Sequence, residues 1–285
     1  MTSLRSQNGF TLVELITVMV LLTILSVITT QFIVMPMRSF ADIAARGELV
    51  DQADIALQRM SRELRTALPN SIRISSSGTR TSLEYLNTTT GGRFRARMEV
   101  NGTGNPLTNG ATDSFDVLGG INGVITPGPA GLANCLNGNS DCLVIYNTGT
   151  GVGAFNAYSG ANAAAITAVS GNQITFNNGA GWSFPFPIPP TAQQRFFVVD
   201  QPVSYVCDLG TGELLRYAGY SINATQPLAT FSVTGRRLAV NVVGCQFSYV
   251  NGAGARHGLV SIHLQLQNNA ADVSLLHQVH VANVP

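Results

Sequence analysis

Hydrophobic residues follow two different patterns along this chain, one near the N-terminus and one across the remainder. From Phe10 to Met37 the side chains are mostly apolar, and Glu14 is the only charged one. A run of this length exceeds the ~20 apolar residues with which a helix crosses a bilayer. The pattern predicts a membrane-spanning helix over residues 10–37. Pro36 should bend it near its end, because proline lacks a backbone donor and crowds the preceding turn.

A second helical pattern follows the apolar run. Residues 38–68 contain no proline, and apolar side chains recur at every seventh position. This spacing predicts an amphipathic continuation of the helix over residues 38–69, which packs its stripe on a globular domain and ends at Pro69–Asn70. The predicted stripe consists of Ile43, Val50, Leu57 and Leu64, joined by Ala53, Met60 and Ala67.

Short strands are predicted after residue 70. The clearest signal is Val260 to Leu266, where apolar residues alternate with Ser261, His263 and Gln265 as in a half-buried strand. Such strands joined by short turns favour an antiparallel sheet, so the expected fold class is α+β: a long N-terminal helix packed on an antiparallel β domain over 70–285. The predicted strands are 71–74, 82–86, 93–100, 143–146, 173–176, 195–207, 214–222, 237–243, 246–250, 259–267 and 273–281.

The middle of the chain, residues 101–181, is rich in Gly, Asn, Ala and Thr. It indicates an excursion of long loops and small strands that decorates the sheet, and plain flexible surface is favoured over a dedicated binding loop. The following segment, 182–190, contains four prolines and predicts an extended, rigid return to the sheet.

The charge composition points to an envelope protein outside the cytoplasm. Only 11% of residues are charged, and all 16 basic residues are Arg. Removing residues 1–9 takes away Arg5 alone, which leaves 15 Arg against 15 acids. This balance lacks the basic surface that phosphate neutralisation needs, so no nucleic-acid partner is expected.

Four cysteines fit an exported domain with two disulfides, for which three pairings are possible. We favour Cys135 with Cys142, which closes a tight loop, and Cys207 with Cys245, which ties two predicted strands. Neither pair has C-x-x-C spacing, so zinc and redox chemistry are not expected.

Catalytic patterns are absent from the sequence. It has no Lys for a phosphate-binding loop and no G-x-S-x-G elbow. His263, His277 and His280 lie on predicted strands with Asp272 as the one acid nearby, and histidines on a sheet face are usually solvated. We therefore expect a protein that is not an enzyme and has no catalytic residues, cofactor or resident metal.

The strongest motif lies at the start of the apolar run. A secretory signal is cut after its apolar stretch, whereas here the candidate processing point, Gly9–Phe10, precedes it and would leave the anchor on the mature protein. A carboxylate within a membrane helix costs a few kcal/mol, so Glu14 needs a partner, and an amine is the nearest candidate cation.

The stretch from Gly9 to Glu14 resembles the class III signal of type IV prepilins and type II secretion pseudopilins. The resemblance implies that prepilin peptidase removes residues 1–9 and methylates Phe10. It also implies that Glu14 pairs with the N-terminal amine of a neighbouring subunit, which sets axial register because two buried charges compensate only when they meet. The alternative is a plain single-pass anchor. Many major pilins have a proline nearer the middle of this segment, where this chain has Gln31, so the kink position stays open.

Further segments resemble the O-type minor pilins of mannose-sensitive haemagglutinin (MSHA) pilus biogenesis, a group similar to the J-type minor pseudopilins. The resemblance implies a single-pass inner-membrane protein with a cytoplasmic N-terminus and a periplasmic domain. Its expected partners are other minor pilins, the major pilin, prepilin peptidase and the assembly platform. The matching segments are 59–71, 91–96, 203–208, 256–260 and 277–285.

Some pseudopilins bind calcium through acidic loops, so Asp113, Asp116 and Asp141 form a candidate calcium site, with solvated loop acids as the favoured alternative. The leading functional hypothesis is a structural subunit that initiates or caps an MSHA-type pilus. The alternatives are a J-type secretion pseudopilin, a tip adhesin that binds through residues 101–181, and an enzyme using His277 or Asp272.

Overall fold

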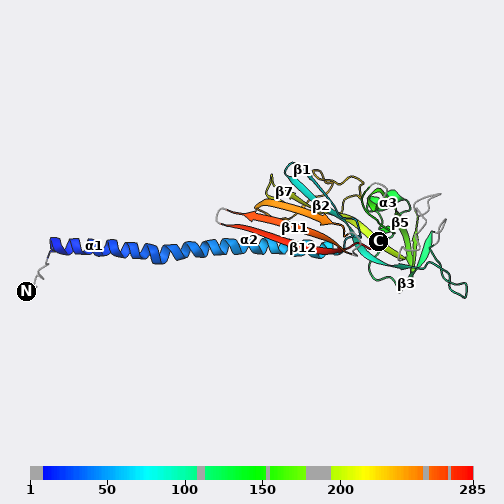
Figure 1. Ribbon diagram of the computed structural model, residues 1–285, viewed down its shortest axis with the longest axis horizontal. Helices are drawn as coiled ribbons and strands as arrows, with labels where there is room; N and C mark the ends of the chain where they lie inside the picture. The colour runs from blue at the N-terminus through cyan, green and yellow to red at the C-terminus, as the bar shows by residue number, and fades with distance from the viewer. Residues whose placement is uncertain are drawn as a thin grey trace, which may run out of the picture.

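The computed structural model describes residues 9–107, 113–151, 155–177, 194–252, 257–268 and 271–284. Figure 1 shows a long helix that projects from a β domain at the opposite end of the molecule. The helix comprises α1 (Leu12–Thr29), a π-helical turn (Thr30–Val34) and α2 (Met35–Leu64). The predicted α+β class, with a long N-terminal helix on an antiparallel β domain, is confirmed. The predicted extended segment 182–190 lies outside the described residues.

The helix is irregular one turn before Pro36. The π-helical turn Thr30–Val34 contains Gln31, and Pro36 occupies the first turn of α2. Because Pro36 has no N–H to donate and its ring crowds the turn before it, a wider turn there relieves the clash without ending the helix. The irregularity therefore lies over Thr30–Val34, which includes Gln31 and ends just before Pro36.

Twelve strands make up the β structure of the described residues, and all their pairings are antiparallel. A short helix, α3 (Leu132–Leu136), and a 3₁₀ turn (Ala157–Ser159) lie between them. The strands are β1 (Arg73–Ser77), β2 (Arg80–Phe94), β3 (Ser114–Leu118), β4 (Cys142–Val144), β5 (Ala163–Ser170), β6 (Gln173–Phe176), β7 (Arg195–Asp208), β8 (Glu213–Ala218), β9 (Arg236–Ala239), β10 (Val242–Val250), β11 (His257–Gln267) and β12 (Asp272–Ala282).

Two long strands, β2 and β7, organise the larger sheet. They pair from Arg80↔Asp208 to Arg93↔Arg195, with a register shift near Asn87 and Thr88. Over the first part of this pairing β1 adds to β2, while β8 and then β9 add to β7. Beyond the register shift the same two strands enter a second structure, so they join two halves of the domain.

That second structure is a small closed barrel. The pairings run β2–β3, β3–β6, β6–β5, β5–β4, β4–β7 and back to β2. All six strands send side chains into one core, which includes Phe94, Phe115, Leu143, Ile166, Phe176 and Phe196. The barrel lies at the end of the molecule away from the projecting helix (Figure 1).

The barrel corrects the interpretation of residues 101–181 as flexible surface. Its strands β3 and β5 were not predicted, and Ala163, Ala164 and Ala165 are all fully buried. Ala164 faces the barrel core, whereas Ala163 and Ala165 pack in a cluster with the α3 residue Cys135. Strand β5 was missed because a strand buried on both faces shows no polar alternation, and because alanine has a low intrinsic preference for strands.

The second half of α2 closes the main core. Its buried face contacts side chains of the larger sheet and of the three-stranded sheet β10–β11–β12. The buried residues of α2 are Leu49, Ala53, Ala56, Leu57, Met60, Ser61 and Leu64. The predicted stripe is thus wrong at Ile43, which is 68% exposed, and at Val50, which is also exposed, because both lie off the helix face that packs on the two sheets.

Several predicted boundaries also differ from the structure, among them the end of the predicted strand 214–222, which stops at Ala218. The helix ends at Leu64 rather than at Pro69, because Leu68 N–H donates to Leu86 O and draws the chain toward β2. The predicted strand 93–100 stops at Phe94, and the chain turns back where Glu99 N–H donates to Thr103 O. The predicted strand 237–243 is divided at Asn241, which has a positive φ of 59°.

A charged cluster fixes α2 to the larger sheet. The Glu63 carboxylate accepts hydrogen bonds from Tyr205 Oη on β7 at 2.5 Å, from Arg216 Nε on β8 at 2.7 Å and from Arg59 Nε at 3.0 Å. Burial alone raises the pKa of Glu63, but the hydrogen bonds from Tyr205, Arg216 and Arg59 together outweigh burial and lower it. The carboxylate is therefore favoured in its charged form.

The four cysteines form two close pairs. Cys135 of α3 is joined to Cys142 of β4 by a disulfide with a Cα–Cα distance of 5.0 Å. Cys207 on β7 and Cys245 on β10 are present as thiols. A hydrogen bond with Cys207, and then burial, raise the pKa of Cys245 well above its usual range. The predicted Cys207–Cys245 disulfide, which would tie the two sheets together, stays a prediction.

Glu63→Gln is expected to lower the free energy of unfolding by about 1–3 kcal/mol at neutral pH, because it weakens charge-assisted bonds to Tyr205 and Arg216. The folded pKa of Glu63 is depressed, so its stabilisation is present above the unfolded pKa and is lost as pH falls through the folded pKa. Chemical denaturation of the full chain in detergent, at neutral pH and in acidic steps, measures this difference. Glu48→Gln, on an exposed part of α2, is the control. A difference that persists unchanged in acid would contradict the assignment.

Oxidation of the protein is expected to join Cys207 to Cys245, and the link should add about 2–4 kcal/mol to stability. Under non-reducing conditions Cys207→Ser should lower the melting temperature much more than it does in the presence of a reductant. Peptide mapping by mass spectrometry detects the bond directly. Recovery of both residues as free thiols from protein exported to an oxidising compartment would refute the pairing.

Candidate functional site

The predicted processing point lies just outside the helix. Gly9 and Phe10 precede α1, and Thr11 is its N-cap, with an extended backbone at φ −78° and ψ 151°. Phe10 is 83% exposed, and Gly9 has no atom near the position of a Cβ. A non-helical, exposed peptide is accessible to a protease, so the geometry places the Gly9–Phe10 bond where cleavage is possible.

Glu14 lies in the first turn of α1 and takes part in the N-terminal cap of the helix. Its backbone N–H donates to Thr11 Oγ1, and its Oε2 accepts from the Thr11 N–H, each at 3.3 Å. This is a capping box, in which two unpaired helix donors are satisfied reciprocally. Among the described residues no cation forms an ion pair with Glu14. The carboxylate is held at the helix start and keeps lone pairs for a cation.

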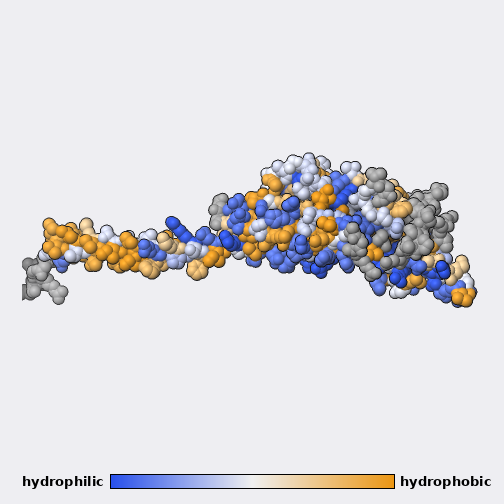
Figure 2. Space-filling view, viewed as in Figure 1, coloured by the Kyte–Doolittle hydropathy of each residue, from blue (hydrophilic) through white to orange (hydrophobic). Residues whose placement is uncertain are grey.

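The apolar side chains of α1 have no partner within the chain. No residue of α1 or of the π-helical turn is buried. Figure 2 shows mostly hydrophobic residues on the visible face of the far half of the projecting helix. Exposing apolar surface to water costs roughly 25 cal/mol per Å², so this helix requires a lipid or protein environment. The described residues contain one helix, Leu12–Leu64, long and apolar enough to cross a membrane.

The polar residues of α1 are compatible with that environment. Thr23 Oγ1 donates to Val20 O, Thr29 Oγ1 to Leu25 O and Thr30 Oγ1 to Ser26 O, at 2.8–2.9 Å. Each hydroxyl is satisfied by the helix itself, which removes most of the cost of placing it in lipid. Glu14 is then the one charged side chain in the run.

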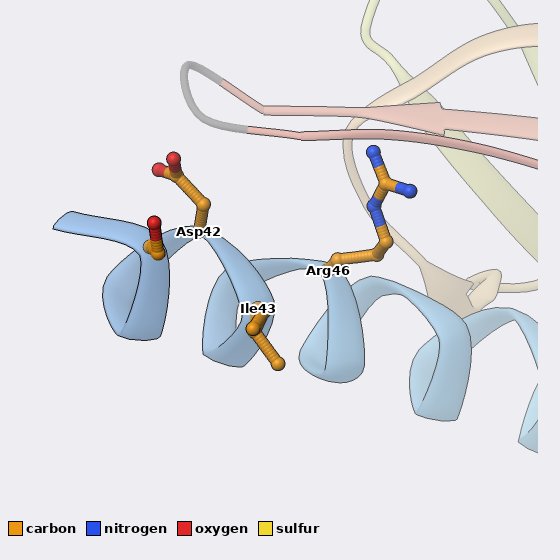
Figure 3. Close-up of a pocket in the computed structure, with 4 residues that line it drawn as sticks. Asp42, Ile43 and Arg46 are labelled. Atoms are coloured by element: carbon orange, nitrogen blue, oxygen red, sulfur yellow. The ribbon is translucent and has the colours of Figure 1, made fainter. Parts of the chain in front are cut away.

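Between the apolar segment and the domain lies an exposed stretch of α2. A pocket of about 450 Å³ is lined by Ser39, Asp42, Ile43 and Arg46. Figure 3 shows Asp42 and Arg46 pointing to the side of the helix on which β11 and β12 lie, while Ile43 points away. Phe40 and Ile43 are strongly exposed, so this stretch offers apolar side chains outside the membrane segment.

The other candidate residues do not assemble into a reactive site. The described residues contain no group of three or more His, Cys, Asp and Glu that could hold a metal ion. Asp116 pairs with Arg95 at 3.3 Å, and Asp141 instead accepts from Thr126 N–H at 2.7 Å. His263 is hydrogen bonded to Ser274 at 2.8 Å, and His280 is exposed. The predicted calcium set of Asp113, Asp116 and Asp141 is therefore not brought together.

The sequence analysis missed two features of the structure. Glu63 sits in a run of charged helical residues, and only the pairing of β7 with β8 shows that Tyr205 and Arg216 meet it. Asp200 is an isolated acid in an apolar strand, which was a usable signal because such a residue needs a reason.

Comparison with known proteins supports the N-terminal motif. Residues 4–30 match the family described as prokaryotic N-terminal methylation motif. No curated protein and no solved structure matches the chain. The match covers a small part of the sequence and includes Gly9, Phe10 and Glu14. The motif and the exposed apolar helix together fit a membrane-anchored protein that is processed by a prepilin peptidase, and they support a place for this chain in the type IV pilin-like superfamily.

Proposed function

We propose that this chain is a minor structural subunit that helps to initiate or cap an MSHA-type pilus. The observation that carries the proposal is the bare N-terminal helix, whose residues are all exposed as far as Ala44 while the methylation motif lies at its start. Such a helix is stable in a membrane before assembly, and among the helices of neighbouring subunits afterwards. The motif indicates a structural subunit rather than an enzyme.

Glu14 supplies the specificity of this packing. Cleavage before Phe10 would create a positively charged amine, and Glu14 is the single charge in the surrounding apolar run. In a low-dielectric environment an unpaired carboxylate is costly. Packing of the subunit is therefore most favourable at the one axial position where Glu14 meets an amine. Before Glu14 meets an amine, the capping box with Thr11 holds its carboxylate at the N-terminal end of the apolar run.

The barrel supports a capping position over a place in a repeating shaft. The barrel adds a second folded unit at the end of the domain away from the helix (Figure 1). Such bulk is tolerated at a filament tip. The choice of an MSHA-type pilus over a J-type secretion pseudopilin rests on the resemblance of segments such as 59–71 and 277–285. In the cell, the domain would lie in the periplasm and contact other minor pilins.

Gly9→Ala is expected to block removal of residues 1–9, because the peptidase reads the residue before the cut bond. The precursor should then migrate more slowly on a gel, and mass spectrometry should find no methylated Phe10. Gly47→Ala is the matched control, since Gly47 is exposed in α2 and has open space around it. Normal maturation of the Gly9 variant would refute the prepilin assignment.

Cells that lack this chain are expected to carry few or no filaments, and Glu14→Ala should lower the filament number nearly as far. Electron microscopy counts measure both effects, with Glu48→Ala, on exposed α2, as the control. Normal filament number and length in the deletion strain would overturn an assembly role. If those filaments also failed to adhere, the tip-adhesin alternative would replace it.

A further inference from the structure

A tight turn of the chain after β2 projects from the barrel. Glu99 N–H donates to Thr103 O and Gly102 N–H donates to Glu99 O, each at 2.9 Å, so residues 99–103 form the apex of a hairpin. Gly102 has a φ of 79°, which glycine adopts without strain. Figure 1 shows this loop at the end of the molecule away from α1. All residues of 97–103 are exposed, so the apex faces the surroundings of the protein and not its core.

The base of the hairpin is fixed to the barrel. The Arg95 guanidinium pairs with Glu99 at 3.0 Å and with Asp116 of β3 at 3.3 Å. Arg95 N–H donates to Asp116 O, and Leu107 N–H donates to Arg95 O, both at 2.8 Å. Because none of these contacts involves residues 100–103, they position the turn and leave its apex uncovered.

The apex carries an acceptor motif. Its sequence is Glu99-Val100-Asn101-Gly102-Thr103, and the last three residues form an Asn-x-Thr sequon whose middle residue is not proline. Enzymes that transfer N-linked glycans recognise this motif, and an occupied sequon lies on the surface of an exported protein because the glycan is bulky and hydrophilic. An exposed turn, on a domain proposed to lie in the periplasm, meets both conditions.

The side chains of the sequon leave the acceptor nitrogen unpaired. Asn101 Oδ1 accepts from Thr103 N–H at 3.0 Å, and the Thr103 hydroxyl lies 2.7 Å from the same oxygen. These contacts hold the amide by its oxygen, and Asn101 Nδ2 makes no hydrogen bond within the part of the chain that the structure describes. The Thr103 hydroxyl also lies 3.2 Å from Glu99 Oε2, which places a carboxylate beside the acceptor.

Asn87 and Asn223 each begin another Asn-x-Thr sequon, and both differ from the one at the apex. Asn87 lies within β2, and its Nδ2 donates to Asp200 Oδ1 at 2.8 Å. Asn223 is exposed, but its Nδ2 donates to a neighbouring backbone oxygen at 2.8 Å. Neither follows an acid two residues earlier, as Asn101 follows Glu99. Of the three sequons, the one at Asn101 combines an exposed turn with an unpaired amide.

We infer that Asn101 accepts an N-linked glycan, which a membrane transferase outside the cytoplasm delivers from a lipid-linked diphosphate donor. Asn101 Nδ2 forms a bond to the anomeric carbon of the sugar, and the bond between that carbon and the diphosphate oxygen breaks. The lipid diphosphate leaves with the electron pair, and a base of the transferase takes the proton that Nδ2 loses. Nothing is oxidised or reduced. The inference rests on the proposed function through the export of the domain.

The glycan would have a local physical role at the end of the barrel. Met98 and Val100 are strongly exposed apolar residues on the same hairpin. A bulky hydrophilic group on Asn101 would cover part of this apolar surface and so oppose nonspecific association of the barrel with other proteins.

The test places the full chain in a bacterial host that supplies an oligosaccharyltransferase and its lipid-linked glycan in the inner membrane. The protein is purified in detergent, and peptide mapping by mass spectrometry locates the glycan. We expect the glycan on Asn101 and little or none on Asn87 and Asn223. The same host with an inactive transferase provides the blank.

Asn101→Gln should abolish the modification, whereas Asn223→Gln, the matched control at an exposed sequon, should leave it unchanged. Thr103→Ala should also abolish it although Asn101 is intact, and Thr103→Ser should retain it because serine keeps the hydroxyl. This pair separates recognition of the sequon by an enzyme from chemical modification of an exposed amide.

The N-terminal peptide in the same map separates this inference from the proposed function. A chain that begins at methylated Phe10 and carries no glycan on Asn101 would overturn the inference and leave the proposed function intact. A chain that keeps residues 1–9 would count against the proposed function. Residues 10–285 behind a cleavable secretory signal then decide the inference: a glycan on Asn101 supports it, and an unmodified Asn101 overturns it.

Discussion

The structure depends on the burial of one face of α2 between two sheets. Met60 and Leu64 are completely buried, and the same core includes Tyr205 of β7 and Ile262 of β11. The second half of the helix therefore contributes to a core that both sheets share. Glu63 adds direction to this packing, because its bonds to Tyr205 and Arg216 hold only at one rotation and one axial position of the helix.

The first half of the long helix, α1 and the π-helical turn, has a different role. It carries no contact to the domain, and its hydroxyl groups are satisfied within the helix. A helix that is apolar on every side has no preferred face, so lipid and a ring of neighbouring helices suit it equally well. The irregular turn before Pro36 lies where the two environments meet, between the segment built for lipid and the stretch that reaches the domain.

The long strands β2 and β7 extend the domain beyond what the helix supports. After the register shift near Asn87 they leave the main sheet and supply two walls of the barrel, whose core is separate from that of the helix. The two cores are therefore joined at a junction on β2 and β7. It contains Asp200 on β7 and Asp141 beside β4, and it is bounded by the loop that the Cys135–Cys142 disulfide closes.

The sequence by itself determined the elements whose signal is local: the processing motif, the apolar helix, the clean alternation in β11 and the nearly unbroken strand β7. Tertiary structure decided the rest. Leu68 leaves the helix because β2 offers it a backbone partner, and Ile43 is exposed because it points away from the strands beside it. Strand β5 is buried on both faces and lacks alternation, while Asp141 and Asp200 meet only through pairings between distant segments. Local periodicity records which face of a segment is apolar, but the partner that covers that face is set by long-range contacts.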